Sequence, residues 1–233
     1  MIKIESLIKS YVGNVVLDIT ELFIPTGECF GLVGNNGAGK TTFLRLILDL
    51  IRANMGNVQI ENENVTESEN WKNFTGAYLD EHMLLGYLTP DEYFDMLSKV
   101  HGLTEEDLKL HMERFRDFFN NEIIGTKKYI RDLSKGNKKR VGISAAFFGH
   151  PQLILLDEPF ESLDPSSQIR LKKIIQNECE ERNTTFVISS HDLDHVTEIC
   201  ERIVLLEEGK IKKDIKGTKE EKFKALDSYF SGI

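Results

Sequence analysis

Residues 34–41 have the types and spacing of a phosphate-binding loop. Gly34 is followed by four residues and then by Gly39, Lys40 and Thr41, between an apolar run and a helical pattern. Glycines let the backbone approach an anion closely, and successive N–H groups at a helix start then point toward it. Lys40 adds positive charge for β- and γ-phosphates, and the Thr41 hydroxyl can ligate Mg²⁺. The predicted nucleotide-binding residues are Asn35, Asn36, Gly37, Ala38, Gly39, Lys40, Thr41 and Thr42.

Two carboxylates follow an apolar strand further along the chain. Residues 153–156 are all apolar, and Asp157 and Glu158 come directly after them. The carboxyl end of a strand in an open parallel sheet faces the ligand crevice. Asp157 is suited to bind Mg²⁺, and Glu158 is suited to orient or deprotonate an attacking water. Strands often end in solvated acids, so the phosphate loop upstream is what favours the catalytic interpretation.

The elements that must position these residues follow from the apolar pattern. Alternation predicts short strands over residues 2–24, and a buried strand over residues 28–33 leads into the phosphate loop. Apolar residues at helical spacing predict a helix directly after the loop. Further strands are predicted around Val58 and Ile60 and up to Tyr78.

The middle of the chain, from about Met83 to Gly149, has a helical period instead. Pro90 marks a helix start, and a stripe of three phenylalanines is more typical of a lobe core than of a binding surface: Phe115, Phe118 and Phe119. Afterwards the α/β pattern returns, with strands at 153–156 and 184–188, a helix from Asp164 and a hairpin at 203–211. The tail from Lys212 is charged and suggests no further domain.

The composition narrows the classes of protein that remain. With 29 Lys and Arg against 38 Asp and Glu, the net charge of −9 argues against a nucleic-acid binder. No apolar run approaches the roughly 20 residues of a membrane span, and the start of the chain lacks a signal-peptide layout. The three cysteines have no paired spacing, so neither a disulfide framework nor a zinc site is expected. We therefore expect a soluble protein of a reducing compartment.

One further segment identifies a family. Residues 133–137, Leu-Ser-Lys-Gly-Asn, precede a helical run and resemble the signature motif of ATP-binding-cassette (ABC) ATPases, usually Leu-Ser-Gly-Gly-Gln. Five other features agree in order and spacing. They are Tyr11 at the place of the adenine-stacking aromatic, residues 78–81 at the Q-loop, Glu158 after Asp157, residues 161–164 at the D-loop and residues 189–192 at the switch histidine. The resemblance covers essentially the whole chain.

The resemblance implies an α/β P-loop NTPase fold: an ABC-type ATPase core with an N-terminal antiparallel β subdomain and a helical subdomain. We expect residues 1–233 to form a single ABC ATPase domain. Within it, residues 1–82 and 151–215 would form the ATP-binding core, residues 83–150 the helical subdomain and residues 216–233 a short C-terminal tail.

The resemblance also implies a shared site. Two cassettes face each other around two ATP molecules, so that each site takes its phosphate loop from one chain and its signature segment from the other. As a good N-cap, Ser134 would turn the positive end of its helix toward a γ-phosphate. The implied signature residues acting in trans are Ser134, Lys135, Gly136 and Asn137.

The remaining roles follow from the same motifs. His191 would contact the γ-phosphate, and Asp164 would belong to the D-loop. The implied catalytic residues are Glu158, His191 and Lys40, the metal-site residues are Thr41, Asp157 and Glu81, and the cofactors are ATP and Mg²⁺. We interpret Lys138, Lys139 and Arg140 as a solvated first helical turn.

Three positions depart from the family pattern. Lys135 replaces the first signature glycine and Asn137 its glutamine, so we expect binding in trans to persist with altered strength. Glu81 stands at the Q-loop position where glutamine is usual. A carboxylate can ligate Mg²⁺ but cannot donate a hydrogen bond, and it adds negative charge near Asp157 and Glu158.

The first functional hypothesis is the ATPase subunit of a membrane transporter, working as a homodimer or as a heterodimer with another ABC ATPase. It would drive a separate transmembrane permease from the cytoplasmic face of the cell membrane, without a span of its own and without nucleic acid. Residues 88–93 and 100–103 resemble bacterial exporter-type cassettes. A soluble ABC ATPase with no transport role, such as an iron–sulfur assembly factor, and an ATP-gated interaction module remain open alternatives. The pattern specifies neither the cargo nor the direction of transport.

Overall fold

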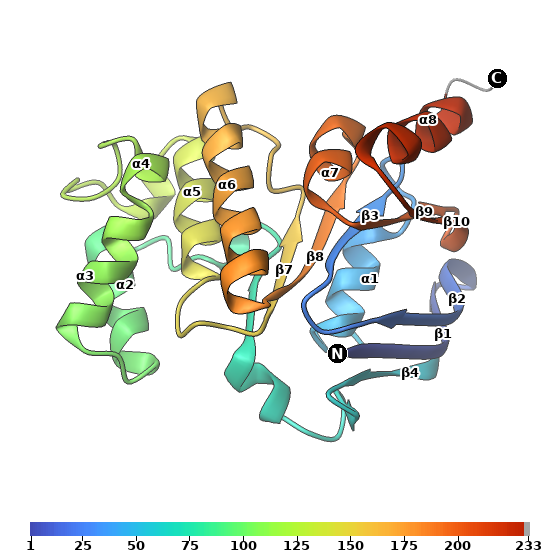
Figure 1. Cartoon of the computed structure of the whole chain (residues 1–233). Helices are drawn as coiled ribbons and strands as arrows, with labels where there is room; N and C mark the ends of the chain where they lie inside the picture. Colours follow the sequence, from blue (N-terminus) through green and yellow to red (C-terminus); the bar gives the residue numbers. More distant parts are fainter. Residues whose placement is uncertain (231–233) are drawn as a thin grey trace.

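The computed structural model describes residues 1–230, with the side chains of residues 1–226. A four-stranded antiparallel sheet in the order β2-β1-β4-β5 forms the N-terminal part, at the lower right of Figure 1. Its strands are β1 (Ile2–Tyr11), β2 (Asn14–Ile24), β4 (Met55–Ile60) and β5 (Glu63–Asn64). Ile2 and Ile4 are buried while Lys3 between them is exposed, as their alternation predicts for a sheet with one covered face.

A second, six-stranded sheet has the order β10-β9-β3-β8-β7-β6. Five neighbouring strands are parallel, and β10 adds an antiparallel edge. The strands β3, β7 and β8 are buried at every residue, which is typical of parallel strands covered on both faces. The bounds are β3 (Cys29–Val33), β6 (Thr75–Tyr78), β7 (Leu153–Asp157), β8 (Thr185–Ser190), β9 (Arg202–Glu207) and β10 (Lys210–Lys216).

Two apolar cores lie on the two faces of this sheet. On one face, alternate residues of β3 and β7 pack with the antiparallel sheet and with α1 (Lys40–Ile47). On the other face they pack with α6 (Pro165–Arg182) and α7 (Leu193–Ile199). The sheet order places β8 between β3 and β7, so the carboxyl ends of these three strands lie next to one another.

The helical lobe lies at the left of Figure 1 and consists of α2 (Pro90–Val100), α3 (Glu105–Arg114), α4 (Arg116–Phe119) and α5 (Lys135–Ala145). Pro90 starts α2 as predicted, behind a capping box between Thr89 and Glu92. The phenylalanine stripe is buried in the lobe core, where Phe115 packs against Phe119 and Phe147. Short 3₁₀ helices cover Asn70–Phe74, Glu81–Met83 and Ile130–Asp132.

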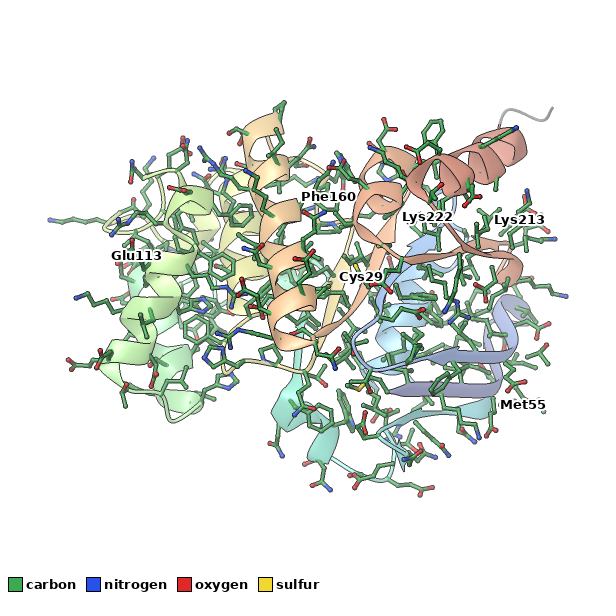
Figure 2. The ribbon with its side chains drawn as sticks, viewed as in Figure 1. Cys29, Met55, Glu113, Phe160, Lys213 and Lys222 are labelled. Atoms are coloured by element: carbon green, nitrogen blue, oxygen red, sulfur yellow. The ribbon has the colours of Figure 1, made fainter. Side chains whose placement is uncertain are left out.

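The charged tail, for which the sequence pattern suggested no further domain, contains the end of β10 and then α8 (Lys219–Phe230), which packs against α7. Leu226 is fully buried and Lys222, labelled in Figure 2, is also buried, with its ammonium donating to the carbonyl oxygen of Cys200. Across residues 1–230, the structure contains no helix with the length and apolar character needed to cross a bilayer.

Candidate active site

The phosphate loop connects β3 to α1 over residues 34–39. Gly39 is the N-cap of α1 with φ 107°, a left-handed conformation that favours glycine, and it provides no side-chain cap. A Cβ at Gly34 would lie 2.2 Å from the carbonyl oxygen of Leu206, so only glycine fits there. The uncapped N–H groups at the start of α1 are the donors that an anion at a helix N-terminus uses.

Lys40, the first residue of α1, folds its side chain back over the loop. It is 6% exposed, and its Nζ donates to the carbonyl oxygen of Gly34 at 2.6 Å. The same Nζ lies 3.2 Å from Glu158 Oε1, which forms this ion pair but no hydrogen bond within the described residues. The phosphate-loop lysine and the acid after β7 therefore meet, although 118 residues separate them in the chain.

Thr41 and Asp157 also meet. Thr41 Oγ1 donates to Asp157 Oδ2 at 2.5 Å, and Ser189 Oγ donates to the other carboxylate oxygen, Oδ1. Hydroxyl and carboxylate oxygens are the hard ligands that Mg²⁺ prefers, and Mg²⁺ in nucleotide sites is held by one or two carboxylates together with the phosphates. This pair of oxygens therefore fits Mg²⁺.

Glu158 lies at the centre of the contacts between strands. Its Oε2 is 2.9 Å from His191 Nδ1 and accepts from the His191 backbone N–H at 3.2 Å. Its own N–H donates to Ser189, both to Oγ at 3.0 Å and to the carbonyl oxygen at 3.2 Å. Residues from β3–α1, β7 and β8 are thus joined in one cluster, because the three strands end side by side.

The signature segment forms the start of α5. Ser134 is its N-cap, with Oγ accepting from the Asn137 N–H at 3.2 Å. Ser134 and Lys135 are exposed, and Lys135 Nζ lies 3.9 Å from Glu161. A Cβ at Gly136 would lie 2.9 Å from the Ser162 carbonyl oxygen.

The side chain of Asn137 is used within its own chain. Its Nδ2 donates to Glu122 at 3.2 Å, and its Oδ1 accepts from Arg140 at 2.8 Å. The two signature positions that depart from the family pattern therefore differ in their surroundings. The side chain of Lys135 is exposed, whereas the amide of Asn137 is bonded to residues of its own chain.

Three further predicted residues make their contacts with residues outside the central cluster. Glu81 forms an ion pair with Lys138 Nζ at 3.0 Å. Tyr11 ends β1 and is 46% exposed, with the Lys9 ammonium 4.7 Å from its ring centroid. Asp164 caps α6, and hydrogen bonds from Ser166 and Ser167 hold the pKa of its carboxyl well below its usual range.

The interpretation of residues 138–140 as a solvated turn is wrong for two of them. Lys139 and Arg140 are each 6% exposed. Arg140 binds Asp164 and donates to Ser167 Oγ at 2.8 Å, which ties α5 to α6. Lys139 reaches the backbone of Glu158. Three consecutive basic residues at a helix start indicate exposure, and only the tertiary packing reveals that two of them are covered.

A cleft of about 270 Å³ lies between these parts of the molecule. Its walls come from the segment after β6, from the start of α5 and from the end of β7, including Glu81, Lys139, Asp157 and Glu158. Phe160, labelled in Figure 2, follows the acidic pair and packs on the ring of His195 of α7, with centroids 4.6 Å apart. The segment after β7 is thereby fixed against the core.

Ser189 is a site residue that the sequence pattern did not single out. In the sequence it is only one member of the segment around His191, whereas the structure gives its hydroxyl contacts with both Asp157 and Glu158. Its position two residues before the histidine, at the end of a buried strand, was the available signal.

Known proteins resemble this chain in sequence and in fold. A family model described as ABC transporter matches residues 17–161, more than half of the chain. The ABC transporter ATP-binding protein YtrB of Bacillus subtilis (strain 168) is 33% identical over 227 residues, which cover 96% of this chain and 75% of YtrB. The bacitracin transport ATP-binding protein BcrA of Bacillus licheniformis is 31% identical over 220 residues, covering 92% of this chain and 69% of BcrA.

The solved dimeric structure of the ATP-binding cassette MJ0796 in a post-hydrolysis state, bound to ADP and Pi, is similar with a TM-score of 0.81. The two chains are 23% identical, and the match covers 93% of this chain and 98% of that one, so it supports the predicted P-loop ABC ATPase fold. The family model and the related sequences show that the chain belongs to the ABC transporter family, as one of its ATP-binding ATPase proteins.

Proposed function

We propose that this protein binds and hydrolyses ATP as the nucleotide-binding subunit of an ABC transporter, dimerises around two Mg-ATP and drives a separate permease. The observation that carries the proposal is the meeting of Lys40, Thr41, Asp157, Glu158 and His191 at one edge of the parallel sheet. Each of these side chains has the chemistry that phosphoryl transfer to water requires.

In this proposal each residue of the site has a separate role in binding or hydrolysing ATP. The phosphate-loop N–H groups and Lys40 bind the β- and γ-phosphates, and Thr41 and Asp157 hold the metal. Mg²⁺ bound there would neutralise charge on the phosphates. Glu158 takes the proton of the attacking water, while His191 orients the carboxylate through its contact with Oε2. Tyr11 is assigned to stack on the adenine with its exposed ring.

The second half of each site is assigned to the partner cassette. Ser134 caps an exposed helix start, where the dipole of α5 and the charge of Lys135 favour an anion. The similar cassette MJ0796, whose post-hydrolysis state is dimeric, supports this arrangement. A homodimer would contain two identical sites related by a twofold axis.

A complementation experiment tests the shared site. Neither Ser134→Arg alone nor Lys40→Ala alone should hydrolyse ATP, because every site in each dimer is damaged. An equal mixture should recover about a quarter of wild-type turnover, because half of the dimers are mixed and each has one intact site. Sedimentation of Glu158→Gln with and without ATP measures dimerisation directly. A Glu158→Gln chain that stays monomeric with ATP would refute the sandwich.

Transport and its direction are the finer part of the proposal. The relatives named above are, by their names, an ABC transporter ATP-binding protein and a bacitracin transport ATP-binding protein. We propose that this chain likewise acts at the cytoplasmic face of a membrane with a permease of the exporter type. Affinity capture from detergent-solubilised membranes should recover an integral membrane protein with several spans. Recovery of cytosolic partners alone would instead support an ABC ATPase outside transport.

A further inference from the structure

Lys139 connects the signature helix to the main chain of the proposed catalytic glutamate. It is 6% exposed, and its Nζ donates to the carbonyl oxygen of Glu158 at 2.6 Å. Lysine is seldom buried to this degree unless its ammonium has a partner. Here the hydrogen-bond acceptor is a backbone oxygen, and the nearest carboxylate, that of Glu161, is 4.0 Å away.

The backbone of Glu158 needs support because it has an unfavourable conformation. Its φ of 46° lies in the left-handed region, which a residue with a side chain seldom adopts. Such a conformation persists only where the surroundings hold it. Ser189 holds the N–H of this residue. Its carbonyl oxygen accepts from Lys139 Nζ at 2.6 Å and, over a longer distance of 3.3 Å, from the Glu161 backbone N–H. Both main-chain polar groups of Glu158 are therefore held by residues of other elements.

The charges around Lys139 come from three directions. Lys135 lies one turn earlier on α5, Glu161 lies on the loop after β7, and Asp157 and Glu158 lie at the end of β7. Burial lowers the pKa of the Lys139 ammonium, and the Glu161, Glu158 and Asp157 carboxylates oppose that effect. These carboxylates thus offset part of the effect of burial on the Lys139 ammonium.

We infer that Lys139 is a positioning residue that couples the orientation of α5 to the aim of the Glu158 carboxylate. The same helix begins at Ser134, the residue assigned to the partner's nucleotide, and carries Lys139 just over one turn later. A rotation of α5 would displace the Lys139 amine. Because this amine is bound to the carbonyl oxygen of Glu158, the backbone of Glu158 would move with it. Engagement of the signature segment thus reaches the base of the same chain. This inference rests on the proposed role of Glu158.

The first test replaces the ammonium and keeps the length of the side chain. Lys139→Met should lower kcat for ATP about tenfold, while KM and the affinity for a fluorescent ATP analogue change less than about twofold. Lys139→Arg, which can still donate to the same oxygen, should recover most of the loss. Lys128→Met, an exposed lysine of the lobe, is the matched control and should keep wild-type turnover. Unchanged kcat in Lys139→Met would overturn the inference.

A double mutant separates positioning from general damage. In the Glu158→Gln background there is no base to aim, so adding Lys139→Met should not reduce the residual turnover further. A further tenfold reduction would mean that Lys139 acts elsewhere and would overturn the inference. If Glu158→Gln itself keeps wild-type turnover, the proposed function fails instead, which is a distinguishable result.

The inference stays testable if Lys139→Met does not fold. Lys139→Gln keeps an uncharged N–H donor group on a shorter side chain. It should give a kcat between those of wild type and Glu158→Gln, with unchanged nucleotide affinity. Equal losses of kcat and nucleotide affinity in that variant would contradict a positioning role.

Discussion

The starts of α1 and α5 make an instructive comparison, because both are helix N-termini assigned to phosphate and their first turns are built differently. The N-cap of α1 is Gly39, which offers no side chain, and Lys40 beside it is buried. The N-cap of α5 is Ser134, which bonds its own helix, and Lys135 beside it is exposed. The first arrangement leaves its N–H groups to a ligand inside the chain. The second presents a hydroxyl and a charge outward, which suits a surface that meets another chain.

The largest expected effect concerns the half of the site built within the chain. Glu158→Gln removes the proposed base while keeping the shape of the side chain, so ATP turnover should fall about 10³-fold. ATP binding should persist, because the phosphate loop is intact. Glu113→Gln, on the exposed surface of the lobe (Figure 2), is the matched control and should keep its turnover. Steady-state phosphate release and equilibrium nucleotide binding measure the two quantities, and wild-type turnover in Glu158→Gln would remove the base assignment.

The second prediction concerns pH and the lobe that carries α5. Burial among aromatic rings lowers the pKa of His111 to about 3, so the folded protein favours the neutral ring. The stability this confers is complete above the ordinary pKa near 6.5 and is lost as pH falls from 6.5 toward 3. At pH 5 the loss is about 2 kcal/mol. In His111→Phe this loss should be absent, so urea unfolding curves of the two proteins should diverge between pH 7.5 and 5; parallel pH dependences would contradict it.

Two helix caps with the same hydrogen-bond length allow a third comparison. Ser134 Oγ and Thr104 Oγ1 each accept from a backbone N–H three residues on, at 3.2 Å. Ser134→Ala and Thr104→Ala should each lose about 1 kcal/mol of stability. Only Ser134→Ala should also lose turnover, by about tenfold, because its hydroxyl alone is assigned to a partner's phosphate. Equal turnover in the two variants would reduce Ser134 to a structural cap.

The smallest expected effect concerns the Q-loop departure. Glu81 and Lys138 form a partly exposed ion pair, so their coupling should amount to only about 0.5 kcal/mol. A double-mutant cycle of Glu81→Gln and Lys138→Gln, read by urea unfolding, measures it.

Glu81→Gln should also change the Mg²⁺ concentration needed for half-maximal turnover, if Glu81 contributes to the metal site. An identical Mg²⁺ dependence in the two proteins would mean that Glu81 only pairs with Lys138 of α5 and takes no part in the metal site.

Much of the fold was predictable because its signals are local. A few consecutive residues are enough to predict the phosphate loop, the apolar run before Asp157 and the strand before His191. A parallel sheet then brings such strand ends together. Helix starts at Pro90 and Asp164 carry their own caps. Lys139 and Ser189 could not be found this way, because their roles depend on contacts between elements distant in the sequence. The burial of Lys222 could not be found this way either, because it depends on the contact of its ammonium with the distant carbonyl oxygen of Cys200.

The strand order also governs when the site can form during synthesis. β3, which leads into the phosphate loop, pairs with β8 and β9, and both lie more than 150 residues further along the chain. The antiparallel sheet of β1, β2, β4 and β5 is complete within the first 64 residues. The antiparallel part can therefore form early during synthesis, whereas β3 has both of its neighbours only after residue 207 has been made. Because such distant pairings form slowly, nucleotide binding should appear only in the last stage of folding.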